Sequence, residues 1–139
     1  MIVLDTNVLS ELMRQSPHEG VVQWLDTQPN ASLFTSTITQ AEILYGVSIL
    51  PAGKRKQGLA AAVDEMFEHD FRGRVLPFDG PAAVTYAAIC TDRARLGQPI
   101  SQFDAQIAAI ARSRGSALAT RNTSDFDECG IRVIDPWQG

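Results

Sequence analysis

The amino-acid sequence predicts an α/β fold of three layers: a small parallel β-sheet with helices on both of its faces. Short apolar segments that suit buried strands alternate along the chain with longer segments whose apolar residues recur at helical spacing. This alternation is typical of parallel strands joined by helical crossovers. The chain has 139 residues, close to the commonest domain size, and we expect a single domain over residues 1–139.

The first part of the chain contains two strand patterns and two helix patterns. Residues 2–4 have the pattern of a short buried strand. Asp5 is the first of three polar residues that can turn or cap the chain before a helix that continues through Met13. A second helix is expected over residues 18–26, and residues 33–35 have the next strand pattern.

Two amphipathic helices follow the second strand. The first is expected to begin at Thr39 and carries an apolar stripe from residue 43 to residue 50. A basic triplet at residues 54–56 leads into the second helix, whose apolar side includes Leu59, Val63, Met66 and Phe67.

The rest of the chain repeats the alternation of strands and helices. After a strand pattern at residues 75–78, Asp79 with Pro81 marks the start of a helix, and Gly97 with Pro99 marks its end. Three shorter features come after a helix that begins at Ser101 and ends near Ser113: strands over residues 117–120 and 131–134, with a turn or short helix over 124–128 between them.

Composition and charge exclude several classes of protein. Apolar residues make up 45% of the chain, yet no run approaches the ~20 residues that span a bilayer, and no signal-peptide pattern is present. The two cysteines, Cys90 and Cys129, are too few for a secreted disulfide framework, so we expect reduced thiols in a cytoplasmic protein with no membrane partner. The net charge of -4 argues against nucleic-acid binding by charge alone, but it is compatible with an acidic metal site.

Three carboxylates occupy unusual positions. Asp5 interrupts an apolar start, where it can be a turn former, and Glu42 follows Thr39 at the spacing of a capping box. Asp104 follows Ser101 at the same spacing and can favour the positive end of a helix. However, Asp104 shares a helix face with apolar residues and has no basic residue within helical reach, so it should point inward.

If these acids meet at the carboxyl ends of the strands, they need a cation. Two carboxylates about 5 Å apart repel by roughly 3 kcal/mol at an effective dielectric of about 20, so three pairs cost on the order of 10 kcal/mol. Oxygen ligands favour Mg²⁺ or Mn²⁺ over zinc, and the two histidines, His18 and His69, lie on polar helix faces. Such a site can activate water for phosphodiester hydrolysis.

Five segments resemble one protein family in the same order along essentially the whole chain. They are MIVLDTNVLSEL at residues 1–12, ITQAEILYGV at 38–47, FDAQIAAIA at 103–111, LATRNTSDF at 118–126 and VIDPW at 133–137. The sequence resembles the PIN-domain toxins of bacterial toxin–antitoxin pairs, most closely the VapC group and its FitB-like branch. The resemblance implies a PIN-like fold and an Mg²⁺- or Mn²⁺-dependent ribonuclease that a cognate antitoxin inhibits.

The resemblance also assigns site residues. Asp5, Glu42 and Asp104 match the metal-binding acids of the family, with Glu42 as a ligand or as the base for the attacking water. Asn122 departs from the Asp of some relatives, and either Asn122 or Asp125 can fill this fourth position, although Asp125 can instead cap the short helix nearby. Three small polar residues are suited to orient Asp5 or a bound water: Thr6, Asn7 and Thr120.

Basic residues are the candidates for RNA contacts. Arg121 adjoins a strand end and can bind phosphate with both of its terminal nitrogens, and weaker candidates are Arg112, Arg114 and residues 54–56. The family implies a homodimer and a higher hetero-oligomer in which a DNA-binding antitoxin occupies a groove of the early helices. The groove would contain Val8, Leu9, Leu12, Val21, Val22, Trp24 and Leu25. Trp137 is expected to pack against the domain.

Two alternative functions come from other classes. The chain can be a non-catalytic RNA- or protein-binding PIN module in which Asn122 marks a weakened metal site. It can also be a metal-dependent nuclease on single-stranded DNA, or a phosphatase on a small substrate. The sequence does not identify the RNA, the number of metal ions or the size of the oligomer.

Overall fold

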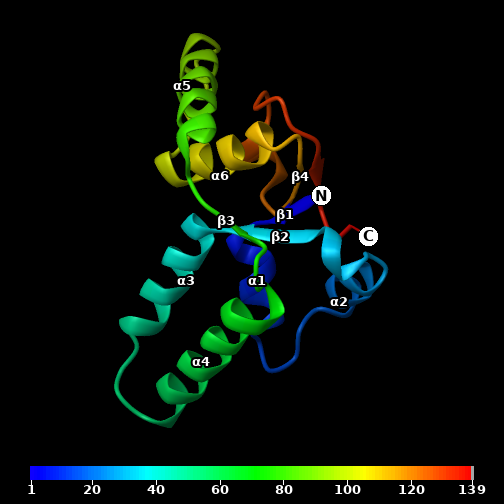
Figure 1. Ribbon diagram of the computed structural model, residues 1–139, viewed down its shortest axis with the longest axis vertical. Coiled ribbons are helices and arrows are strands. Elements are labelled where there is room, and N and C mark those ends of the chain that lie inside the picture. The colour runs from blue at the N-terminus through cyan, green and yellow to red at the C-terminus, as the bar shows by residue number, and fades with distance from the viewer. Residues whose placement is uncertain (139) are drawn as a thin grey trace.

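Short runs of aliphatic residues form one parallel sheet, with the strand order β3-β2-β1-β4-β5 (Figure 1). The structure is a computed structural model that describes residues 1–138. Its strands are β1 (Ile2–Leu4), β2 (Leu33–Ser36), β3 (Val75–Leu76), β4 (Ala117–Ala119) and β5 (Val133–Ile134). The central strand β1 pairs with β2 on one side and with β4 on the other.

Helices cover both faces of the sheet, as the sequence predicts. They are α1 (Thr6–Leu12), α2 (Glu19–Asp26), α3 (Thr37–Ser48), α4 (Lys54–Glu65), α5 (Gly80–Arg95) and α6 (Gln102–Ser113). In Figure 1, α5 and α6 lie on one side of the sheet, and the other four helices lie on the opposite side. Shorter helical turns are 3₁₀ turns at Asn30–Ser32 and Thr123–Phe126 and a π-helical turn at Met66–Asp70.

The core has two parts because β1 is buried on both faces. Val3 and Leu4 are neighbours in the strand and both are fully buried, but they point to opposite sides of the sheet. Leu4 packs in the cluster that contains Val8 of α1, and Val3 packs in the cluster that contains Ile89 of α5. The strand that carries Asp5 at its carboxyl end is therefore held from both sides.

The start of α3 differs from the expected one. The Ser36 hydroxyl accepts the N–H of Thr39 at 3.0 Å, so Ser36 is the N-cap and the helix begins at Thr37. The prediction that Thr39 and Glu42 form a capping box is therefore wrong. The physical reason is that Ser36 is still extended at the end of β2, which places its hydroxyl beside the first free N–H groups of the helix.

Two further observations bear on the sequence-based expectations. No helix within residues 1–138 combines the length and the apolar character that a membrane crossing requires. Cys90 is half-buried, Cys129 is buried, and both are free thiols.

Candidate active site

Asp5, Glu42 and Asp104 line one cavity of about 520 Å³ at the carboxyl ends of the central strands. Asp5 directly follows β1, Glu42 lies in the second turn of α3 and Asp104 lies in the first turn of α6. Parallel strands end at the same edge of a sheet, and the helices that follow them begin there. The predicted convergence of the three acids is therefore present in the structure.

Hydrogen bonds orient the buried carboxylate of Asp5. One of its oxygens accepts the N–H of Thr6 at 2.8 Å, and the other accepts the hydroxyl of Thr120, also at 2.8 Å. The side-chain amide of Asn7 donates to the Thr120 oxygen at 3.1 Å. Thr120 thus holds Asp5 directly, and Asn7 acts on it through Thr120.

The Thr6 side chain contacts Glu42 instead of Asp5. Its hydroxyl donates to Glu42 Oε1 at 3.0 Å and lies 3.1 Å from the hydroxyl oxygen of Thr39. Glu42 is half-buried and is available to the cavity because Ser36, rather than Glu42, satisfies the N–H of Thr39.

Asn122 and Asp125 have different positions relative to the cavity. Asn122 lines it and is exposed, and its backbone N–H donates to the Thr120 hydroxyl at 3.2 Å. Asp125 lies inside the 3₁₀ turn rather than at its N-cap, which is Asn122, so the alternative that Asp125 caps this turn is wrong. The negative charge of Asp125 contributes to the raised pKa of Asp5 and of Asp104.

The three acids are electrostatically strained. Burial raises the pKa of Asp5, Glu42 and Asp104 above the ordinary carboxyl values, and neighbouring negative charges add to this effect. The hydrogen bonds that the carboxylates accept oppose the shift. An acid with a raised pKa holds a proton or a cation more firmly in the folded than in the unfolded chain. The charged forms of these groups therefore destabilise the fold.

No basic side chain forms a salt bridge with these carboxylates in the part of the chain that the structure describes, although the positive charge of buried Arg93 partly offsets the raised pKa of Asp104. The ion pairs of this part of the chain join Arg14 to Glu11, Arg114 to Asp79 and His69 to Glu65. An arginine paired with each acid would remove the need for a cation. Within residues 1–138, none of the three acids has such a pair.

The donor set suits a hard divalent cation. The candidate ligands that line the cavity are carboxylate, amide and hydroxyl oxygens. Among the residues that the structure describes, no histidine or cysteine lines this cavity. Over residues 1–138, no three acidic, histidine or cysteine side chains are close enough to hold one ion together. An ion in this cavity would take one or two carboxylates and keep several waters, as Mg²⁺ usually does.

Only one of the three arginines predicted to contact RNA lies at the cavity. Arg121 lines it, and its guanidinium lies over the ring of Trp137, with 5.1 Å between the guanidinium carbon and the ring centre. Arg112 lines a different hollow beside Met1, and Arg114 bonds Asp79 at 3.3 Å. The physical reason is that α6 begins at the cavity with Asp104 and ends at the opposite edge of the sheet.

Sequence reasoning did not assign four of the residues that line the cavity: Ser10, Glu11, Arg14 and Trp137. Glu11 is buried in α1, accepts the N–H of His18 at 3.1 Å and pairs with Arg14. Trp137 packs against the core, as expected, but it also lines the cavity. The spacing of Glu11 and Arg14 on one helix was the available signal for the ion pair, whereas no local pattern places Trp137 near Asp5.

The prediction that apolar residues of the first two helices line a groove is wrong in part. Val8, Leu9 and Val21 are fully buried core residues, because these helices pack their apolar faces onto the sheet. A hollow of about 600 Å³ is lined by Leu12, Val22 and Leu25 of the predicted set. A larger groove, of about 940 Å³, lies between α1, α3 and α4 and shares Glu42 with the carboxylate cavity. Its basic lining residues include Lys54 of the predicted triplet.

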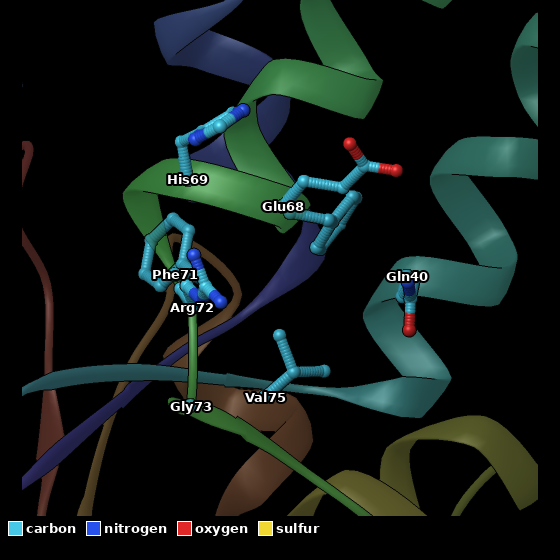
Figure 2. A pocket seen from close by; sticks show the side chains of 8 residues that line it. Gln40, Glu68, His69, Phe71, Arg72, Gly73 and Val75 are labelled. Atoms are coloured by element: carbon cyan, nitrogen blue, oxygen red, sulfur yellow. The ribbon is translucent and has the colours of Figure 1, made fainter.

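Another hollow, of about 570 Å³, lies away from the three acids. Figure 2 shows it between the first turn of α3, which carries Gln40, and the segment that follows α4, with Glu68 and His69. Glu68 and His69 are exposed, and this hollow lacks the converging carboxylates of the other cavity. We therefore assign the chemistry to the cavity with Asp5.

Comparison with known proteins agrees with this geometry. The model of the PIN domain family matches residues 2–131. The chain belongs to the PIN domain family. This PIN domain is 41% identical to the VapC ribonuclease Y4jK of Sinorhizobium fredii over 99% of each chain. It is also 41% identical to the toxin FitB of Neisseria gonorrhoeae over 99% of each chain.

The fold of this PIN domain is also that of a solved relative. A structure of FitAB bound to an IR36 DNA fragment contains a chain that superimposes with a TM-score of 0.93 at 41% identity. The match covers 99% of this chain and 96% of the other.

Proposed function

We propose that this PIN domain is the toxin of a toxin–antitoxin pair and a metal-dependent endoribonuclease. The observation that carries the proposal is the cavity that Asp5, Glu42 and Asp104 line, with none of the three acids in a salt bridge within residues 1–138. The relatives named ribonuclease and toxin support the reaction class, and the FitAB complex supports a protein partner. The free thiols support a cytoplasmic location.

Each acid has a role that follows from its surroundings. Asp5 and Asp104 are the chief ligands of Mg²⁺ or Mn²⁺, and Asn122 or Asp125 supplies a weaker fourth position. When bound, the ion lowers the pKa of a coordinated water and offsets the charge that develops on the phosphate oxygens. Glu42 is the ligand of a second ion or the base that takes the water proton. Its raised pKa makes it a stronger base than an exposed glutamate.

The neighbouring side chains keep the acids in position. Thr120 and the N–H of Thr6 fix both oxygens of Asp5, so its carboxylate cannot rotate away from the cavity. The Thr6 hydroxyl fixes Glu42 in the same way. Partners of this kind commonly change metal affinity or activity by about 10- to 100-fold when they are removed.

The experiment that tests the reaction class compares two polymers. We expect the purified chain with Mn²⁺ to cleave single-stranded RNA and to leave single-stranded DNA of the same sequence intact. Cleavage of the DNA alone, or of a small phosphomonoester alone, would identify the other enzyme classes. Mn²⁺ binding by calorimetry without cleavage of any of them would identify a non-catalytic binding module.

Arg121 is the residue proposed to contact RNA. We expect Arg121→Ala to weaken binding to single-stranded RNA several-fold and to lower the salt dependence of binding by about one counterion, because one phosphate contact is lost. Fluorescence anisotropy over a range of salt concentrations measures both quantities. Arg112→Ala is the matched control, since Arg112 lies at another hollow. An equal effect of the two substitutions would contradict this assignment.

The antitoxin is proposed to occupy the groove between α1, α3 and α4. The groove joins the carboxylate cavity at Glu42 and is lined by apolar Val47 and Leu50 together with basic Lys54 and Arg55. An amphipathic segment with acidic flanks fits this lining. If Leu50→Asp leaves the affinity for the co-expressed antitoxin unchanged, the groove is not its site.

A homodimer is part of the same proposal. Apolar side chains on α3 and α5 are exposed, with 67% of Tyr45, 63% of Ile49 and 75% of Val84 accessible. Both helices lie toward the left of the view in Figure 1, α5 on one side of the sheet and α3 on the other. A monomeric mass in analytical ultracentrifugation at micromolar concentration would contradict dimerisation.

A further inference from the structure

Trp137 has no role in the function proposed above, although it lines the carboxylate cavity. Its ring lies 5.1 Å from the guanidinium carbon of Arg121. This distance is within the range of a cation–π interaction. The two residues therefore form a pair at the edge of the cavity.

The backbone fixes both members of the pair. The N–H of Arg121 donates to the side-chain oxygen of Asn7 at 3.2 Å, which ties the residue to α1. The N–H of Trp137 donates to the carboxylate of Asp135 at 2.9 Å, and the half-buried indole packs against the core. Trp137 is thus a rigid platform, whereas an exposed arginine alone samples many rotamers.

The position of Arg121 over the ring also keeps it away from the acids. Arg121 lines the same cavity as Asp5 and Asp104, where an unrestrained guanidinium would be drawn to the carboxylates. Within residues 1–138, the ion pairs involve two other arginines and one histidine, and Arg121 is in none of them. Stacking occupies the face of the guanidinium and leaves the N–H groups at its edge free to donate.

We propose that Trp137 is a positioning residue that holds the Arg121 guanidinium at the rim of the cavity, where it binds a backbone phosphate of the RNA strand. This inference rests on the proposed ribonuclease function. It assigns Trp137 a part in substrate binding, not in the chemical step. The ligand of the pair is one phosphodiester group, and the nucleobase is not recognised by the ring.

A double-mutant cycle tests the proposal. KM and kcat are measured with Mn²⁺ on a fluorescein-labelled single-stranded RNA for the parent chain, Trp137→Leu, Arg121→Ala and the double variant. We expect Trp137→Leu to raise KM about two- to five-fold with kcat unchanged, the size expected for an exposed cation–π pair. In the Arg121→Ala background, Trp137→Leu should raise KM no further.

Two control variants make the cycle specific. Trp137→Phe keeps an aromatic face and should hold KM near that of the parent. Arg132→Ala removes an exposed arginine from the hollow at the opposite edge of the sheet and should leave KM and kcat unchanged.

Three outcomes would overturn the proposal. Additive effects of the two substitutions would mean that the indole contacts RNA itself. A lower melting temperature and kcat with an unchanged KM would mean that Trp137 is only structural. An unchanged KM in Trp137→Leu would mean that Arg121 needs no platform. The proposed function fails separately, if the parent chain cleaves no RNA.

Discussion

Replacing Asp5 or Asp104 with asparagine should lower the rate of RNA cleavage by at least about 100-fold, because each substitution removes a charged ligand of the cation. The fold should survive both changes. Asparagine at position 5 still offers its oxygen to the N–H of Thr6 or to the Thr120 hydroxyl, so only one of the two hydrogen bonds of Asp5 is lost. The measurements are the initial rate with Mn²⁺ and the cooperativity of thermal unfolding.

Asp64→Asn is the matched control for these two variants. Asp64 is an exposed aspartate of α4, and its substitution should leave the cleavage rate at the parent value. Parent-like cleavage by both Asp5→Asn and Asp104→Asn would rule out the proposed mechanism.

In a chelating buffer at pH 7, Asp104→Asn should melt at the same temperature as the parent chain or a few degrees higher. The folded-state pKa of Asp104 is raised by burial, so its charged form destabilises the fold above that pKa, and asparagine removes this charge. The gain is small because the side chain is half-buried and its charge is partly screened by solvent.

Addition of Mn²⁺ should then reverse the order of the two melting temperatures. A cation that binds the folded chain raises the melting temperature of the parent, while Asp104→Asn binds it too weakly to respond. The advantage of the variant in chelator should also shrink as the pH falls, because the parent carboxyl takes up a proton. A variant that melts well below the parent in chelator would show that Asp104 stabilises the fold without a cation.

Local signals explain why most helix ends could be predicted. Asp79 caps α5 with its own side chain, and Ser101 caps α6 in the same way. Each of these ends depends on residues within one turn of the chain. The start of α3 could not be chosen from sequence, because Ser36 and Thr39 are both good capping residues. Only the end of β2 decides between them.

The site residues also differ in whether local sequence signals could place them. The convergence of Asp5, Glu42 and Asp104 follows from strand ends and helix starts, which sequence periodicity locates well. The position of Trp137 depends on the path of the chain after β5, and the far end of α6 determines where Arg112 lies. Both positions depend on how distant segments of the chain pack together. The sequence separation between these residues and the site residues therefore did not predict where Trp137 and Arg112 lie.

The hydrogen bond between Thr120 and Asp5 spans 115 residues of the chain. The same distant segments pair as β1 and β4 at the middle of the sheet. A growing polypeptide therefore cannot arrange its acidic cavity until β4 has left the ribosome, and closing so long a loop costs conformational entropy. During synthesis, competence for cleavage therefore cannot precede the appearance of β4.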